Sequence, residues 1–247
     1  MRSAAGVPVR PRSGAGLGFA VLAAATLVLI DASLSVAAAH GVADRDAAYL
    51  ESVAGFAFWP YLYLGAKHMV TGYDHVLFLV GVVFFLYRFR DVALYVSMFS
   101  IGHSITLLTG VLGHIAVNPF AVDAVIGLSV TYKALDNLGA FRTLFGVEPN
   151  PKAAVLLFGL VHGFGLATKL QGLQLSAEGL VPNMLAFNIG VELGQILVLV
   201  LVLSLMSAWR ATPSFRRMAV ATNVVLLAAG VLLFEVQLAG LLSGAAA

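Results

Sequence analysis

The chain has 247 residues, of which 60% are hydrophobic and only 11% carry a charge, and its mean hydropathy is +0.96. This composition lies far outside the range of soluble globular domains and predicts an integral protein of a lipid bilayer. The formal charge is only +2, and no GxxxxGK[ST] phosphate-binding loop occurs, so we expect neither a nucleic acid nor a nucleotide as partner. The chain has no cysteine, which leaves imidazole, carboxylate, carbonyl and thioether groups as possible metal ligands.

Residues 1–39 predict an export signal. Three arginines precede the short apolar run "LGFAVLAAATLVLI", and "SVAAAHG" offers small residues for cleavage near Ala39. Asp31 interrupts the run before it reaches the roughly 20 residues of a membrane-spanning helix. An uncleaved signal anchor is the alternative. In either case residue 40 lies outside the cytoplasm.

The rest of the chain predicts an all-α, polytopic membrane helix bundle. Residues 40–69 should form an extracytoplasmic N-terminus that ends in an interfacial or re-entrant helix, because "SVAGFAFWPYLYLGA" is aromatic and contains Pro60. Residues 70–247 should form one domain of six transmembrane helices, because lipid tolerates only helices or closed barrels as spanning structures. The six apolar stretches cover residues 70–87, 92–112, 119–139, 153–171, 182–207 and 218–242.

The positions of lysine and arginine predict the orientation. If the first span starts outside, Arg88, Arg142 and Arg210 all fall on the cytoplasmic side, whereas the outer loops hold little basic charge beyond Lys169. This distribution agrees with the positive-inside rule. We therefore expect the inner (cytoplasmic) membrane of a bacterial-type cell, with the mature N-terminus and the C-terminus outside the cytoplasm.

Ionisable residues gather at one depth of the predicted bundle. Counting about 1.5 Å per residue from the helix ends places four of them near the bilayer midplane and two nearer the outer surface. Each buried ionisable side chain costs about 2.5 to 3.5 kcal/mol on insertion scales, so four at one depth indicate a functional site. Hydrogen bonding between helices is the alternative, and it suits one isolated residue better than the set. The midplane residues are His75, His103, His162 and Glu192, and the outer ones are His68 and Asp123.

The surroundings of two histidines suit a site. Ser100 and Ser104 flank His103 and are candidate hydroxyl partners for its ring. Glycines bracket His162 in "FGLVHGFGLA" and let neighbouring helices approach closely, which would bring His162 toward other ligands. The alternative for these glycines is helix packing alone.

The fifth span and the mature N-terminus supply further candidate ligands. In "FNIGVELGQ", Asn188, Glu192 and Gln195 recur at spacings of four and three, so they share a helical face that we expect to point inward. Cleavage after Ala39 would make His40 the first residue, whose α-amine and imidazole could together chelate a divalent metal. The alternative is that His40 is only a remnant of the cleavage site.

The stretch "GAKHMVTGYDHVLFL" poses a geometric problem. On a regular helix His68 and His75 share a face but lie about 10.5 Å apart in height, and Asp74 points about 120° away from His68. The three residues can hold one ion only if the helix unwinds, for which Gly72 offers a hinge. Otherwise His68 is an outer station on a path and His75 belongs to the midplane set. Both arrangements are consistent with the sequence.

Five blocks occur in order between about residues 60 and 200: "HMVTGYDHVLFL", "FSIGHSITLL", "VDAVIGLSVTYKALDN", "FGLVHGFGLA" and "FNIGVELGQ". In these blocks the chain resembles the HupE/UreJ family of membrane proteins, which are proposed nickel or nickel/cobalt permeases. Met69 follows His68 where the hydrogenase-linked branch has proline, so the chain looks like a second branch of the family. The resemblance implies metal handling by His68, Asp74 and His75, and it also covers His103, Asp123, His162 and Glu192.

We therefore expect a permease for a divalent transition metal ion, with nickel first and cobalt or zinc as alternatives, and no cofactor besides this ion. Imidazole and carboxylate ligands suit all three ions, and transport sites lie between helices near the midplane. The alternative is an intramembrane metal-dependent enzyme that activates water on zinc. The spread of ligands in depth favours the permease, since a catalytic site needs one cluster. The enzyme would use His75, His103, His162 and Asp74.

Overall fold

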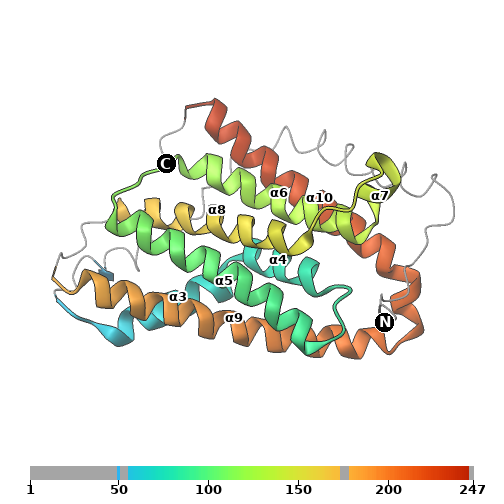
Figure 1. The fold of residues 1–247 in the computed structure, drawn as a ribbon, viewed down its shortest axis with the longest axis horizontal. Coiled ribbons are helices and arrows are strands. Elements are labelled where there is room, and N and C mark those ends of the chain that lie inside the picture. Colours follow the sequence, from blue (N-terminus) through green and yellow to red (C-terminus); the bar gives the residue numbers. More distant parts are fainter. Residues whose placement is uncertain (1–48, 51–54, 173–177, 245–247) are drawn as a thin grey trace.

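The computed structural model describes residues 49–50, 55–172 and 178–244 (Figure 1). The predicted signal peptide, its cleavage site near Ala39, and His40 lie outside these described residues. All regular elements in the described part are helices, which confirms the all-α class. They are α3 (Phe58–Thr71), α4 (Tyr73–Val83), α5 (Phe89–Leu112), α6 (Pro119–Asn137), α7 (Ala140–Phe145), α8 (Pro151–Gln171), α9 (Leu180–Arg210) and α10 (Pro213–Leu242).

Four helices of the described part, α5, α8, α9 and α10, are long and apolar enough to cross a membrane. The chain is therefore a multi-pass membrane protein. Helix α6 has 19 residues but carries three charged ones, Asp123, Lys133 and Asp136. The apolar stretch at 70–87 is not one helix, because the helical conformation stops at Gly72 and α4 is only 11 residues long.

The bundle is built from three intimate helix pairs, α5 with α8, α6 with α10, and α3 with α9. Figure 1 shows the members of these pairs lying lengthwise beside each other. Glycines make the contacts possible: a methyl group on Gly163 of α8 would collide with the His103 carbonyl of α5, and one on Gly65 would collide with the Phe187 carbonyl of α9. The prediction that the glycines around His162 allow close helix approach is confirmed.

Helix α9 holds both ends of the α3–α4 segment. At the start of α3, the Asn183 side chain accepts a hydrogen bond from the Ala57 N–H (2.8 Å) and donates one to the Gly55 carbonyl (2.9 Å). At the end of α4, the Arg210 guanidinium donates to the carbonyls of Val83 and Phe84. Helix α3 thus packs along α9, and its predicted place at the membrane surface stays a prediction.

Asparagine–proline pairs fix the starts of α6 and α8, which carry Asp123 and His162. Asn118 caps α6 by accepting a hydrogen bond from the Ala121 N–H (3.3 Å), and Asn150 caps α8 by accepting one from the Lys152 N–H (3.0 Å). In both helices proline follows directly, where its missing N–H costs nothing. These caps fix the residues at which α6 and α8 begin.

A group of buried and half-buried polar side chains lies where α4, α6 and α10 meet, and we call it the α6–α10 polar cluster: Lys133, Asp136, Asn137 and Asn223. Lys133 and Asp136 form an ion pair. The Asn137 amide donates to the Gly81 carbonyl of α4 (2.9 Å) and to the Asn223 side chain (2.9 Å), which in turn donates to the Ala219 carbonyl (2.9 Å). Each side chain of this cluster therefore has a hydrogen-bond partner within the protein.

Candidate metal site

The break between α3 and α4 creates the site. Gly72 ends α3 in an extended conformation (ψ 101°), with its N–H bonded to the His68 carbonyl (3.0 Å), and α4 resumes when the Val76 N–H bonds to the Gly72 carbonyl (3.2 Å). The chain turns so that the rings of His68 and His75 meet edge to face, 4.9 Å between centroids. The structure thus confirms the unwound turn. His68 as a separate outer station is wrong, because its ring meets that of His75 across the break instead of lying two helical turns away.

Gly72 is required here by close approach. A Cβ atom on this residue would collide with His75 Nδ1 and would lie 3.0 Å from Asp74 Oδ1. Because Gly72 has no side chain, the side chains of Asp74 and His75 in the first turn of α4 can lie close against the break.

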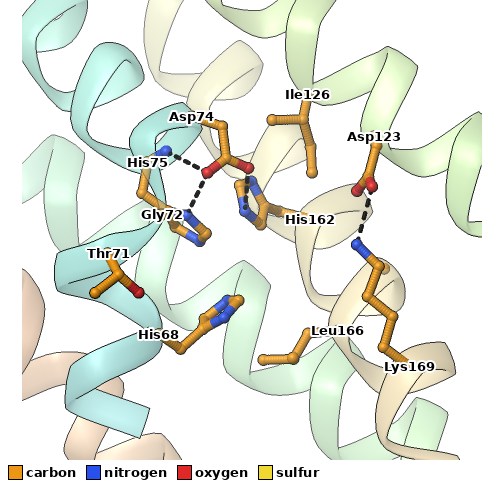
Figure 2. Close-up of a pocket in the computed structure, with 11 residues that line it drawn as sticks. His68, Thr71, Gly72, Asp74, His75, Asp123, Ile126, His162, Leu166 and Lys169 are labelled. Atoms are coloured by element: carbon orange, nitrogen blue, oxygen red, sulfur yellow. Dashed lines mark hydrogen bonds and ion pairs between the residues drawn. The ribbon is translucent and has the colours of Figure 1, made fainter. Parts of the chain in front are cut away.

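Asp74 lies at the centre of the polar contacts (Figure 2). Its Oδ1 accepts a hydrogen bond from the His75 backbone N–H (2.9 Å) and lies 2.9 Å from His75 Nδ1, while its Oδ2 lies 3.9 Å from His162 Nε2 on α8. The ring centroids of His75 and His162 are 4.1 Å apart. Ligand atoms of Asp74, His75 and His162 all lie within 4.8 Å of one another, and all three residues are buried.

Several ring nitrogens in and behind this site have no hydrogen bond. Within the described ranges, no partner reaches Nε2 of His68, Nε2 of His75, or either nitrogen of His103. A buried polar atom without a partner costs about 1 to 3 kcal/mol, so such atoms call for an explanation, and a bound ion is one. With its proton on Nδ1, His75 is oriented by Asp74 and keeps the Nε2 lone pair for a metal, the carboxylate–histidine arrangement of many metal sites.

His103 lies behind the site. Its ring centroid is 5.7 Å from that of His162 and its ring stacks on Phe99, but it does not line the pocket around Asp74. Ser100 is not its hydroxyl partner, because that hydroxyl donates to the Gln195 side chain of α9 instead (2.6 Å). The predicted role of Ser100 is therefore wrong.

Asp123 joins the site from α6, but it is paired. Its Oδ2 lies 2.9 Å from the Nζ of Lys169, and both residues line the same pocket as His68, Asp74 and His162. We call this pocket, with His75, the histidine pocket. Figure 2 shows the Asp123–Lys169 pair facing the histidines from the opposite side.

Two predicted ligands on α9 do not reach the histidine pocket. Asn188 and Gln195 are buried, as the shared helical face predicted, whereas Glu192 is only half-buried. Neither Asn188 nor Glu192 lines the pocket, and the Asn188 amide donates within its own helix to the Met184 carbonyl (3.1 Å). The helical spacing predicted one face of α9 correctly, but that face packs on α5 through Gln195.

Sequence reasoning missed some residues that line the pocket, above all Lys169, Thr71 and Leu166. Lys169 had a usable signal, because it follows His162 by seven residues and so lies on the same face of α8 two turns later. The Thr71 hydroxyl donates to the carbonyl of Lys67 (2.8 Å), a contact within α3 that the sequence does not mark as part of a site.

Fold and site together define a multi-pass helical membrane protein with a buried cluster of imidazole and carboxylate groups at a helix break. A family model described as HupE / UreJ protein matches residues 44–243, a range that contains α3 to α10. The chain belongs to the HupE/UreJ family. No curated protein and no solved structure matches it.

Proposed function

We propose that the protein is a membrane permease for a divalent transition metal ion, with nickel first and cobalt or zinc as alternatives. One observation carries the proposal: Asp74, His75 and His162 gather their ligand atoms within 4.8 Å in the interior of the helix bundle. Imidazole nitrogen and carboxylate oxygen suit these ions. The HupE/UreJ family, to which the chain belongs, is proposed to transport nickel or cobalt, which supports this order of ions.

The proposed ligands lie on α4, directly after the helix break, and on α8. Asp74, His75 and His162 hold the ion, and His68 offers Nε2 from the other side of the break. Asp123 lies at the same pocket, paired with Lys169. His103 supports His162 from behind, whereas Glu192, Asn188 and His40 have no part in this proposed ligand set.

The proposed membrane arrangement has six crossings after a signal sequence at residues 1–39. Helices α5, α6, α8, α9 and α10 make five of them, and α3 with α4 makes the sixth as a broken crossing. Broken helices lie at the sites of many transporters, because the exposed backbone can face a cavity. Consecutive crossings alternate in direction, so Arg88, Arg142 and Arg210 come to one end of the bundle. The positive-inside rule makes that end cytoplasmic and leaves both mature termini outside.

The test compares uptake of radioactive nickel by cells that carry wild type, His75→Ala or His114→Ala. His114 is the matched control, because it is an exposed histidine on the connection between α5 and α6 and does not line the pocket. We expect His75→Ala to abolish uptake and His114→Ala to leave it unchanged. Equal uptake by wild type and His75→Ala, at equal amounts of protein in the membrane, would contradict the permease.

One observation also suits the metal-dependent enzyme. The sequence favoured a permease because the ligands were predicted at different depths, yet the structure places His68 and His75 side by side. A single cluster with unpartnered nitrogens can hold zinc with an open coordination position. Metal analysis of the purified protein discriminates the two functions: one zinc per chain that survives a chelator, in a protein without uptake activity, would favour the enzyme.

A further inference from the structure

The pocket that we propose for a metal cation already contains a positively charged side chain, Lys169. Lys169 extends from the last turn of α8, and its Nζ lies 2.9 Å from Asp123 Oδ2 on α6. The two side chains are 14% and 7% exposed, so water screens the pair poorly. Both residues line the pocket that also contains Asp74 and His162.

The fold directs this lysine into the pocket. Lys169 follows His162 by two helical turns, about 10.5 Å along the axis. Because side chains on a helix lean toward its N-terminus, the Lys169 stem points back toward His162. Between the two, a Cβ atom on Gly165 would lie 2.9 Å from Val122 Cγ1 and 3.7 Å from Asp123 Oδ1. The missing side chain at Gly165 thus lets α6 approach α8 closely enough for the ion pair.

An ammonium group in the pocket opposes binding of a divalent ion nearby, and this repulsion is stronger in a membrane protein interior than in water. Two carboxylates of the described residues line the pocket. Lys169 forms an ion pair with one of them, Asp123, whereas the other, Asp74, contacts the histidines. Lysine carries its charge on a flexible stem with four carbons, so the ammonium can leave Asp123 without moving α8.

We propose that Lys169 is an internal competitor of the transported ion. When the ammonium pairs with Asp123, the pocket offers one carboxylate; when a metal ion binds at Asp74, it draws Asp123 toward itself and displaces the ammonium. Return of the ammonium to Asp123 then promotes release of the ion. Lys169 is thus a residue that sets the affinity of the site. This inference rests on the proposed function of the histidine pocket.

The experiment measures Co²⁺ binding to the purified full-length protein in detergent, by calorimetry and by the absorption of bound cobalt. The variants are Lys169→Met, Asp123→Asn, the double variant, and Lys152→Met as control, because Lys152 is an exposed lysine at the other end of α8. We expect Lys169→Met to bind Co²⁺ roughly ten to a hundred times more tightly than wild type, the range of typical coupling between two sites. Lys152→Met should bind like wild type.

The other two variants separate competition from a structural ion pair. Asp123→Asn leaves the ammonium without its carboxylate, so the ammonium turns to Asp74 and Co²⁺ binding weakens. The double variant removes both groups and returns the affinity to within a few-fold of wild type, a coupling that the double-mutant cycle measures directly. A pair that only holds α6 to α8 would lower thermal stability in both single variants, and it would not tighten binding in Lys169→Met.

Uptake supplies a second readout. In cells, Lys169→Met should lower the KM for nickel and also lower the maximal rate, because release becomes slow. If Lys169→Met does not fold, Lys169→Gln removes the charge and keeps a polar amide, and the same tighter binding is expected.

Unchanged or weaker Co²⁺ binding by folded Lys169→Met or Lys169→Gln would overturn the inference. A different result would contradict the proposed function itself. If wild type binds neither Co²⁺ nor Ni²⁺, or binds them equally well after His75→Ala, the histidine pocket is not a metal site and the proposed role of Lys169 is wrong too. If His75→Ala abolishes binding while the lysine variants equal wild type, only the competitor role is wrong.

Discussion

The histidine pocket and the α6–α10 polar cluster both contain polar and charged side chains, but they differ in whether these side chains have hydrogen-bond partners. In the cluster, Lys133 pairs with Asp136 and the Asn137 amide bonds to a backbone carbonyl and to Asn223. In the pocket, the Nε2 atoms of His68 and His75 have no hydrogen-bond partner within the described ranges. A satisfied polar network stabilises helix packing, whereas unsatisfied lone pairs keep the capacity to bind. In these two regions, hydrogen-bond satisfaction therefore distinguishes the structural group from the candidate site.

The sharpest test of this comparison removes one side chain from each region. His162→Ala takes away an imidazole whose Nε2 lies 3.9 Å from Asp74 Oδ2, and we expect Ni²⁺ and Co²⁺ affinity to fall by more than about 100-fold, since even the partners behind metal ligands account for 10- to 100-fold. Asn223→Ala is the control and should leave the affinity unchanged, because Asn223 does not line the pocket. Calorimetry on the purified variants measures both. A parallel loss in the two variants would show that the regions do not differ in this way.

The helix break gives the next largest effect. Gly72→Ala places a methyl group against His75 Nδ1, so we expect Ni²⁺ affinity to fall by about 10- to 100-fold while the protein stays folded. Gly172→Ala is a matched control, because the nearest atom to its added Cβ is the Lys169 carbonyl oxygen at 3.3 Å. Wild-type affinity in Gly72→Ala would mean that the approach of residues 72 and 75 is not needed for binding.

A change in the cluster should act on stability alone. Asn137→Ala removes the donor to the Gly81 carbonyl and to Asn223, and we expect it to lower the free energy of unfolding in detergent by about 1 to 3 kcal/mol, the cost of leaving buried polar groups without partners. Denaturant titration followed by circular dichroism measures this change. Nickel affinity should stay at the wild-type value, and a large loss of affinity would extend the metal site to α10.

The smallest effect is expected at the contact between α5 and α9. Ser100→Ala removes one hydrogen bond, to the Gln195 side chain (2.6 Å), whereas Asn137→Ala removes two, and a hydrogen bond between membrane helices contributes about 0.6 kcal/mol on average. Ser204→Ala is the control, since its exposed hydroxyl bonds only to the Val200 carbonyl of its own helix. The same denaturant titration compares the two. Loss of metal binding in Ser100→Ala would restore the serine to the site as a partner of His103.

Some of the site could be predicted because it depends on local sequence. Gly72 between two histidines marked the hinge, and the glycines beside His162 marked a close helix contact; the structure confirms both. Glu192 was predicted at the site because its depth matched that of the histidines. Depth and helical face leave the neighbour undetermined, and in the structure the buried face of α9 contacts α5 through Gln195. The pairing of Asp123 with Lys169 joins residues 46 positions apart and has no local signal.

The sequence by itself determined the membrane class, the approximate helix positions and the kinds of candidate ligand, because each depends on composition and on short-range periodicity. Tertiary structure alone decided which of these residues meet. His68 and His75 come together because the helix is interrupted at an extended Gly72 and the chain turns there. His162 and Lys169 enter the same pocket because α8 can approach α5 at Gly163 and α6 at Gly165. Such contacts depend on the relative register of several helices, which arises only when the whole bundle packs.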